Sequence, residues 1–219
     1  MIVKICGVTS PDNAMMIAEF GADMIGLNFY PKSPRYIEPA KASIICDYLR
    51  DELGDERPLL VGLFVNMPYS HIAEVISVAN LDFVQLSGDE SDELLHELGG
   101  RGFKSIRPQT KAAAIDDVQY YAKEFIDDKR IPSLLLDAYH PKLYGGTGET
   151  ASVEVALAVK AQVPRLMLAG GLNPENVIDR IQAIRPWGVD VASGVELEGQ
   201  PGVKDPYKIE AFIEAAKSA

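Results

Sequence analysis

Short apolar segments alternate with helix-like segments along the whole chain of 219 residues. Several of the apolar segments are almost continuously hydrophobic, which is typical of parallel strands that are covered on both faces. The segments between them carry helix start signals, for example Ser10-Pro11 and the stretch near Ser70. The apolar segments are residues 2–6, 23–29, 59–65, 82–86, 103–107, 133–138, 165–169 and 189–193.

This repetition predicts an α/β fold, namely a single (β/α)₈ TIM barrel domain that spans residues 1–219. An open, doubly wound sheet uses the same alternation of strands and helices. However, no G-x-G-x-x-G motif follows the first strand, and eight strands favour closure of the sheet. No linker rich in proline, glycine or serine suggests a second domain.

The charge of the chain restricts its partners. With 21 basic and 32 acidic residues the formal net charge is −11, and such a surface repels nucleic acid and anionic lipid. An anionic substrate must therefore be held by local backbone N–H groups or by a few cations. The sequence has neither a signal peptide nor an apolar run of about 18 residues that would span a membrane. We expect a cytoplasmic protein that binds neither nucleic acid nor membranes.

The cysteine content argues against a metal site. The chain has two cysteines, Cys6 and Cys46, and no C-x-x-C motif or cluster of cysteine and histidine. We therefore expect no structural metal.

Polar residues that directly follow barrel strands converge on one mouth, where the active sites of such barrels are built. Cys6 ends the first predicted strand, Asp137 follows three leucines in the sixth, and Arg35 lies in the loop after the second. A free cysteine is more often a buried structural residue than a catalytic one. An aspartate at the end of an apolar strand needs a partner, because burying it alone is costly.

Loops after the later strands are rich in glycine. They are YGGTGET at 144–150, LAGGLNPENV at 168–177 and ASGVE at 192–196. Glycine lets the backbone approach a ligand closely, and turns that lead into helices present N–H groups to an anion. Together these loops predict a phosphate site, in the place where such barrels commonly bind phosphate.

The loop YPKSPRYI, residues 30–37, holds Lys32 and Arg35 between prolines and aromatic residues. Prolines reduce the entropic cost of ordering a loop, and a planar guanidinium suits recognition of a carboxylate. We expect this loop to bind part of the substrate.

Seen together, these motifs closely resemble one family. KICGVT, GLNFYPKSPRYI, GLFVN, VQLSGDE, GGTG, LAGGLNPENV and SGVE followed by PGVKD occur in the order typical of phosphoribosylanthranilate isomerases of tryptophan biosynthesis. The resemblance extends from residue 2 to about residue 213. It implies an Amadori rearrangement of N-(5-phosphoribosyl)anthranilate to 1-(2-carboxyphenylamino)-1-deoxyribulose 5-phosphate, without a metal or an organic cofactor.

The resemblance also assigns roles to residues. Cys6 would be the general base, Asp137 the general acid, and Arg35 the residue that holds the anthranilate carboxylate. The phosphate would be held by the backbones of Gly170, Gly171, Ser193 and Gly194, with help from the turn at Gly145 and Gly146.

The residue types suit this chemistry. Opening the furanose ring requires an acid, and an aspartate in a partly desolvated mouth can keep its proton near neutral pH. Removal of the C2′ proton requires a base, and a thiolate with a lowered pKa can serve. Lys4 is on the same strand face as Cys6, and its role stays open between activating Cys6 and lining the barrel interior.

Two departures from the family pattern keep alternatives open. The family usually has Q-L-H-G where this chain has QLSG with Ser87, and it continues toward F-D-W after GGTG where this chain has ETASVEVA. The protein could instead be a non-catalytic sugar-phosphate-binding barrel. It could also isomerise a related phosphoribosyl amine of histidine biosynthesis, although such enzymes typically have aspartate in place of Cys6. The sequence is compatible with a monomer or a homodimer.

Overall fold

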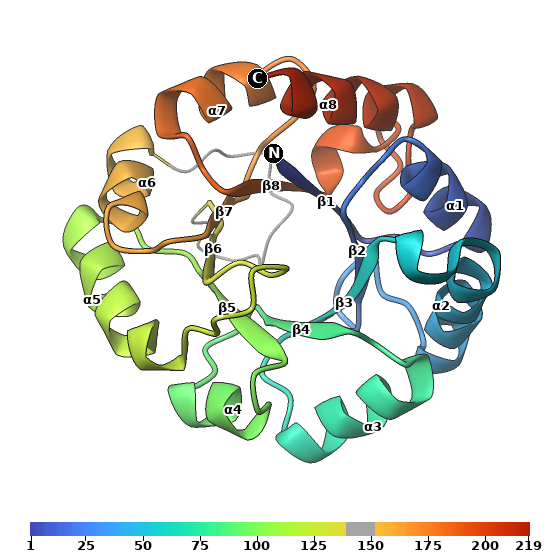
Figure 1. The fold of residues 1–219 in the computed structure, drawn as a ribbon, viewed down its shortest axis with the longest axis horizontal. Coiled ribbons are helices and arrows are strands. Elements are labelled where there is room, and N and C mark those ends of the chain that lie inside the picture. Colours follow the sequence, from blue (N-terminus) through green and yellow to red (C-terminus); the bar gives the residue numbers. More distant parts are fainter. Residues whose placement is uncertain (139–151) are drawn as a thin grey trace.

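The computed structural model describes residues 1–138 and 152–219. Within these residues, eight parallel strands pair in chain order, and the eighth pairs with the first to close a barrel (Figure 1). The helices surround the barrel as an outer ring. The prediction of a TIM barrel is therefore confirmed.

The strands agree with the predicted segments but are shorter at several ends. They are β1 (Ile2–Cys6), β2 (Met24–Asn28), β3 (Leu59–Phe64), β4 (Phe83–Leu86), β5 (Gly102–Ile106), β6 (Leu134–Leu136), β7 (Leu166–Leu168) and β8 (Gly188–Val191). The sixth and eighth predicted segments extended too far. Asp137 lies beyond the end of β6, and Ser193 already begins the 3-10 turn η3 (Ser193–Val195).

The helices follow their strands in regular order. They are α1 (Pro11–Glu19), α2 (Pro39–Leu53), α3 (Tyr69–Ala79), α4 (Asp92–Glu97), α5 (Lys111–Tyr121), α6 (Val153–Lys160), α7 (Val177–Ile184) and α8 (Pro206–Ser218), with short 3-10 turns at Gly54–Glu56 and Ala122–Glu124. The predicted start at Ser10-Pro11 is confirmed, because the Ser10 hydroxyl accepts a hydrogen bond from the Asn13 N–H at 3.3 Å. None of the helices in the described part of the chain is long and apolar enough to cross a membrane.

The side chains of the strands divide into two cores. One face of each strand packs against the helices in a large apolar cluster, and the other face fills the barrel interior. The interior cluster includes Met24, Val61, Phe83, Phe103, Leu135 and Met167. Lys4 is the exception in β1, because it is fully buried although it carries a charge.

Side-chain alternation turns this interior core into a polar mouth. Two residues beyond Phe83, Phe103 and Leu135 along each strand come Gln85, Ser105 and Asp137, which all line one pocket. The apolar layer thus forms the floor of the barrel, and the candidate site lies above it at the carboxyl ends of the strands.

Candidate active site

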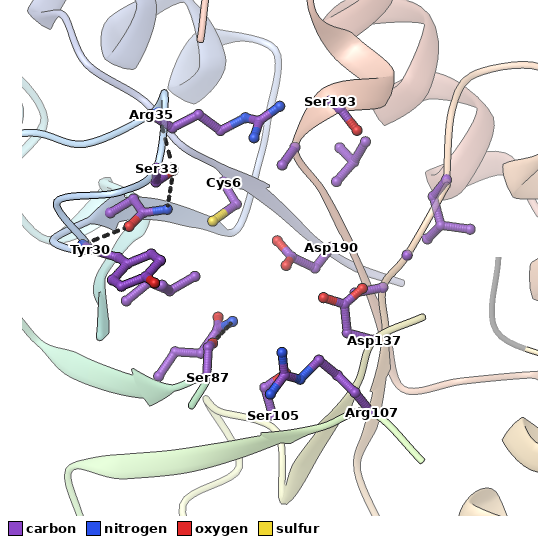
Figure 2. A pocket seen from close by; sticks show the side chains of 18 of the residues that line it. Cys6, Tyr30, Ser33, Arg35, Ser87, Ser105, Arg107, Asp137, Asp190 and Ser193 are labelled. Atoms are coloured by element: carbon purple, nitrogen blue, oxygen red, sulfur yellow. Dashed lines mark hydrogen bonds between the residues drawn. The ribbon is translucent and has the colours of Figure 1, made fainter. Parts of the chain in front are cut away.

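The pocket at the barrel mouth collects side chains from every strand or the loop that follows it (Figure 2). Cys6, Arg35 and Asp137 all line it, so the structure brings together the three side chains that the sequence singled out. Gly170, Gly171 and Ser193 also line the pocket.

Cys6 is the last residue of β1 and is only 4% exposed, with its sulfur directed into the pocket. Gly26 is its partner on β2. A Cβ atom at Gly26 would lie 2.7 Å from the Cys6 sulfur and 3.0 Å from the Lys4 Nζ. The absence of a side chain at this position makes room for the thiol and the ammonium together.

The pKa of Cys6, which the sequence left open, is raised in the structure. Burial raises the pKa of the thiol, and the Lys4 ammonium beside it opposes this effect without cancelling it. The thiol form of Cys6 is therefore favoured over the thiolate that the role of general base requires.

Asp137 follows β6 and remains partly accessible from the pocket. Its Oδ1 accepts a hydrogen bond from the Ala138 N–H at 2.8 Å. Burial raises the pKa of Asp137 to about 6, helped by the negative charge of Asp190 and opposed by Arg107 and Lys4. This direction agrees with the expectation for a general acid.

Arg35 reaches the pocket but has an internal partner that the sequence did not suggest. Its Nε and Nη2 donate to the two carboxylate oxygens of Glu196, each at 2.7 Å. Lys204 donates to the same carboxylate at 3.2 Å. Burial would raise the pKa of Glu196, but the Arg35 hydrogen bond and the Lys204 charge lower it overall. Glu196 therefore fixes the guanidinium by the edge that Nε and Nη2 form.

The loop that carries Arg35 is ordered by hydrogen bonds to Asn28. The Asn28 side chain donates to the Ser33 hydroxyl at 3.0 Å and accepts from the Tyr30 N–H at 2.9 Å (Figure 2). The Ser33 hydroxyl in turn accepts from the Arg35 N–H at 3.1 Å. These contacts position Arg35 before any ligand binds.

The glycine loops after β7 and β8 pack directly against each other. Gly170 and Gly171 both have positive φ angles, 85° and 60°. A Cβ atom at Gly194 would lie 1.9 Å from the Leu172 carbonyl oxygen, so only glycine allows this approach. The two loops form one backbone wall of the pocket. Gly145 and Gly146 lie outside the described residues.

Several residues of the pocket were not predicted as site residues. Asn28, Tyr30, Gln85, Ser87, Ser105, Arg107 and Asp190 are among them. Ser87 is buried and accepts a hydrogen bond from the Gln85 side chain at 3.0 Å. Alternation was a signal for two of them, because Gln85 and Ser105 follow the interior residues Phe83 and Phe103 by two positions.

The pairing of Lys4 with Asp190 was also missed. The Lys4 Nζ donates to the Asp190 Oδ1 at 2.9 Å, across the seam where β8 closes onto β1. Burial would lower the pKa of Lys4, but Asp190 and Cys6 together raise it, so the lysine is charged. A signal was present, since opposite charges occur within the first and last predicted strands.

No group of three or more metal-ligating side chains is found within residues 1–138 and 152–219. A thiol and a carboxyl group that line one pocket can donate and accept protons, which is what general acid–base catalysis requires.

Known proteins are similar to this chain in sequence and in fold. The family N-(5′-phosphoribosyl)anthranilate (PRA) isomerase matches residues 3–215. The N-(5′-phosphoribosyl)anthranilate isomerase of Geobacter metallireducens is 40% identical over 216 residues, covering 99% of this chain and 98% of that protein.

Solved structures of phosphoribosyl anthranilate isomerases are similar to this chain along its whole length. Phosphoribosyl anthranilate isomerase from Thermotoga maritima superposes with a TM-score of 0.84 at 37% identity, covering 100% of both chains. A phosphoribosyl anthranilate isomerase in complex with reduced 1-(o-carboxyphenylamino)-1-deoxyribulose 5-phosphate superposes with a TM-score of 0.81 at 36% identity, again over 100% of both chains. The chain therefore belongs to the N-(5′-phosphoribosyl)anthranilate isomerase family.

Proposed function

We propose that this protein isomerises N-(5′-phosphoribosyl)anthranilate to 1-(2-carboxyphenylamino)-1-deoxyribulose 5-phosphate, as a cytoplasmic step of tryptophan biosynthesis. The observation that carries the proposal is the meeting of Cys6 and Asp137 in one pocket, beside a glycine-lined wall suited to a phosphate. Membership of the family supports the same reaction.

Asp137 acts first in this scheme. It donates its proton to the furanose oxygen as the C1′–oxygen bond breaks, and the nitrogen lone pair forms the C=N bond of an iminium ion. Asp137 becomes a carboxylate. Its raised pKa makes the proton available close to neutral pH.

Cys6 acts second. Its thiolate removes the proton from C2′, and the electron pair of the C–H bond forms an enolamine while the iminium nitrogen becomes neutral. The enolamine then tautomerises to the ketone, in which the C2′ hydroxyl loses its proton and C1′ gains one. Cys6 now carries a proton and Asp137 is a carboxylate, so a proton passes from Cys6 to Asp137, directly or through solvent, before the next turnover. The scheme moves only protons and therefore uses no metal or organic cofactor.

The groups that we assign to the two ends of the substrate line the same pocket, except Gly194, which follows Ser193 in η3. We assign the substrate phosphate to the backbone of Gly170, Gly171, Ser193 and Gly194, because backbone N–H groups can bind an anion in a protein of net charge −11. We assign the anthranilate carboxylate to the edge of Arg35 that Glu196 does not occupy. Holding the substrate at both ends fixes the ribose carbons near the acid and the base.

The test is to mix purified protein with phosphoribosylanthranilate, follow the loss of substrate fluorescence and identify the product by mass spectrometry. We expect catalytic turnover and a product of unchanged mass. Substrate binding without conversion would replace this proposal with the non-catalytic sugar-phosphate barrel. Conversion only of a phosphoribosyl amine that lacks the anthranilate group would contradict the assignment of Arg35.

A further inference from the structure

The proposed reaction starts with the proton on Asp137 and with Cys6 as the thiolate. Burial raises the pKa of both groups, which favours the protonated form of Asp137 but opposes the thiolate form of Cys6. A charged group beside each of them can favour this starting state.

Lys4 and Asp190 lie where such a group is needed. Lys4 is fully buried, its ammonium adjoins the Cys6 thiol, and it donates to Asp190 at 2.9 Å. Asp190 lines the pocket between Cys6 and Asp137 (Figure 2). The ion pair thus presents its positive end to the base and places its negative end beside the acid.

We propose that the buried Lys4–Asp190 ion pair is a positioning device that divides the proton between the two reacting groups, with Lys4 favouring the Cys6 thiolate and Asp190 favouring the protonated form of Asp137. The proposal rests on the roles proposed above for Cys6 and Asp137. It gives Lys4, whose role the sequence left open, a function in the reaction.

The surroundings of each group are consistent with this division. Cys6 faces Lys4 on its own strand, Asp190 on β8 and Lys204 on the segment before α8, while β2 offers only Gly26. The neighbouring guanidinium of Arg35 is held by Glu196. Asp137 faces Asp190, Lys4, and Arg107 just beyond the end of β5. Of these charges, Lys4 has the largest effect on Cys6, and Asp190 is the acidic side chain that raises the pKa of Asp137.

Asp190 acts on both Cys6 and Asp137. We therefore expect that removing the charge of Lys4 and removing the charge of Asp190 shift the pKa of Cys6 in opposite directions. Removing the Lys4 charge raises the pKa of Cys6. Removing the Asp190 charge lowers the pKa of Cys6 and also that of Asp137. A pair that only supported packing would not produce shifts of opposite sign.

The experiment measures the rate of alkylation of Cys6 by iodoacetamide between pH 6 and 11, since this rate follows the thiolate fraction. A Cys6→Ser protein gives the background from Cys46, whose burial raises its pKa to about 12. Relative to the unmodified protein, we expect Lys4→Met to slow alkylation at pH 8 by about tenfold, one pKa unit. We expect Asp190→Asn to accelerate it.

The pKa of Asp137 is measured in a separate experiment. The carboxyl resonance of Asp137 in ¹³C-labelled protein, assigned with Asp137→Asn, should titrate at lower pH in Asp190→Asn. Neither titration uses substrate, so their failure is distinct from a failure of the proposed reaction.

Shifts of the same sign in the two variants, or no shift in either, would overturn the proposal. If Lys4→Met does not fold, Asp190→Asn and the double variant Lys4→Met/Asp190→Asn decide the question. The double variant should alkylate more slowly than Asp190→Asn, and equal rates would also overturn the proposal.

Discussion

Two buried lysine–carboxylate pairs lie within the same barrel and differ in what surrounds them. Lys4 and Asp190 join at 2.9 Å across the seam between β1 and β8, and Lys104 and Glu90 join at 2.8 Å between β5 and the loop after β4. Burial lowers the pKa of Lys104 in spite of Glu90, whereas the pKa of Lys4 is raised by Asp190 and Cys6 against the effect of burial.

The partners of each pair explain the difference. Glu90 also accepts hydrogen bonds from the backbone of Asn66 and Gly88, and Lys104 donates to the Gly88 carbonyl at 2.7 Å. That pair is surrounded by backbone groups and holds a loop in place. The pair of Lys4 and Asp190 has Cys6 and the open pocket as its further neighbours. A buried ion pair thus supports structure or chemistry according to the groups that complete its environment.

Of the ion pairs compared here, the pair of Lys104 and Glu90 should have the largest effect on the free energy of unfolding. Lys104→Met leaves the Glu90 carboxylate buried without its cation, and we expect the free energy of unfolding to fall by about 3–5 kcal/mol. Urea denaturation measures this change. Replacing both partners, as Lys104→Met/Glu90→Gln, should recover part of the loss. A loss below about 1 kcal/mol in the single variant would show that the pair does not stabilise the loop.

The ionised carboxylate of Asp137 should lower the free energy of unfolding at neutral pH. Its folded-state pKa of about 6 lies above the ordinary value of 3.8, so the folded protein binds the proton more tightly than the unfolded chain. The contribution of Asp137 to the free energy of unfolding is fully present below pH 4 and is lost as the pH rises to about 6. At pH 7 we expect Asp137→Asn to be more stable than the unmodified protein by up to about 3 kcal/mol. Denaturation at pH 3 and pH 7 checks this, and a pH-independent difference would contradict it.

The Cys6 thiol and the Lys4 ammonium should need the space that the missing side chain of Gly26 leaves. A methyl group there would lie 2.7 Å from the Cys6 sulfur, and overpacking of this kind costs about 1–3 kcal/mol. We expect Gly26→Ala to lose this much stability and to impair turnover. Because the clash involves the sulfur, the stability cost should shrink in a Cys6→Ala background. A cost that is equal in both backgrounds would place the clash elsewhere.

The exposed ion pair of Lys217 and Asp23 should contribute the least to stability. Lys217 contacts Asp23 at 3.0 Å, but their side chains are 38% and 31% exposed. We expect Lys217→Ala to change the free energy of unfolding by less than about 1 kcal/mol. A larger loss in urea denaturation would mean that burial is not what separates strong from weak pairs in this protein.

The sequence was sufficient for the parts of the structure that depend on local pattern. Apolar runs and helix signals predicted all eight strands, and the position of Cys6 and Asp137 after their strands predicted that they meet. Contacts that depend on barrel closure were not predicted. Lys4 and Asp190 are separated by 186 positions, and Arg35 and Glu196 by 161. The direction of the pKa shift of Cys6 could not be predicted, because burial depends on the packed barrel and not on the neighbours in sequence.

The most direct test of the account is a single-turnover measurement with protein in excess over phosphoribosylanthranilate. Substrate fluorescence is followed for the unmodified protein, Cys6→Ser and Asp137→Asn. We expect rapid loss of fluorescence with the unmodified protein and a rate at least about 100-fold lower in each variant, because a general acid or base usually contributes this much. Loss of fluorescence at the unmodified rate in either variant would contradict it.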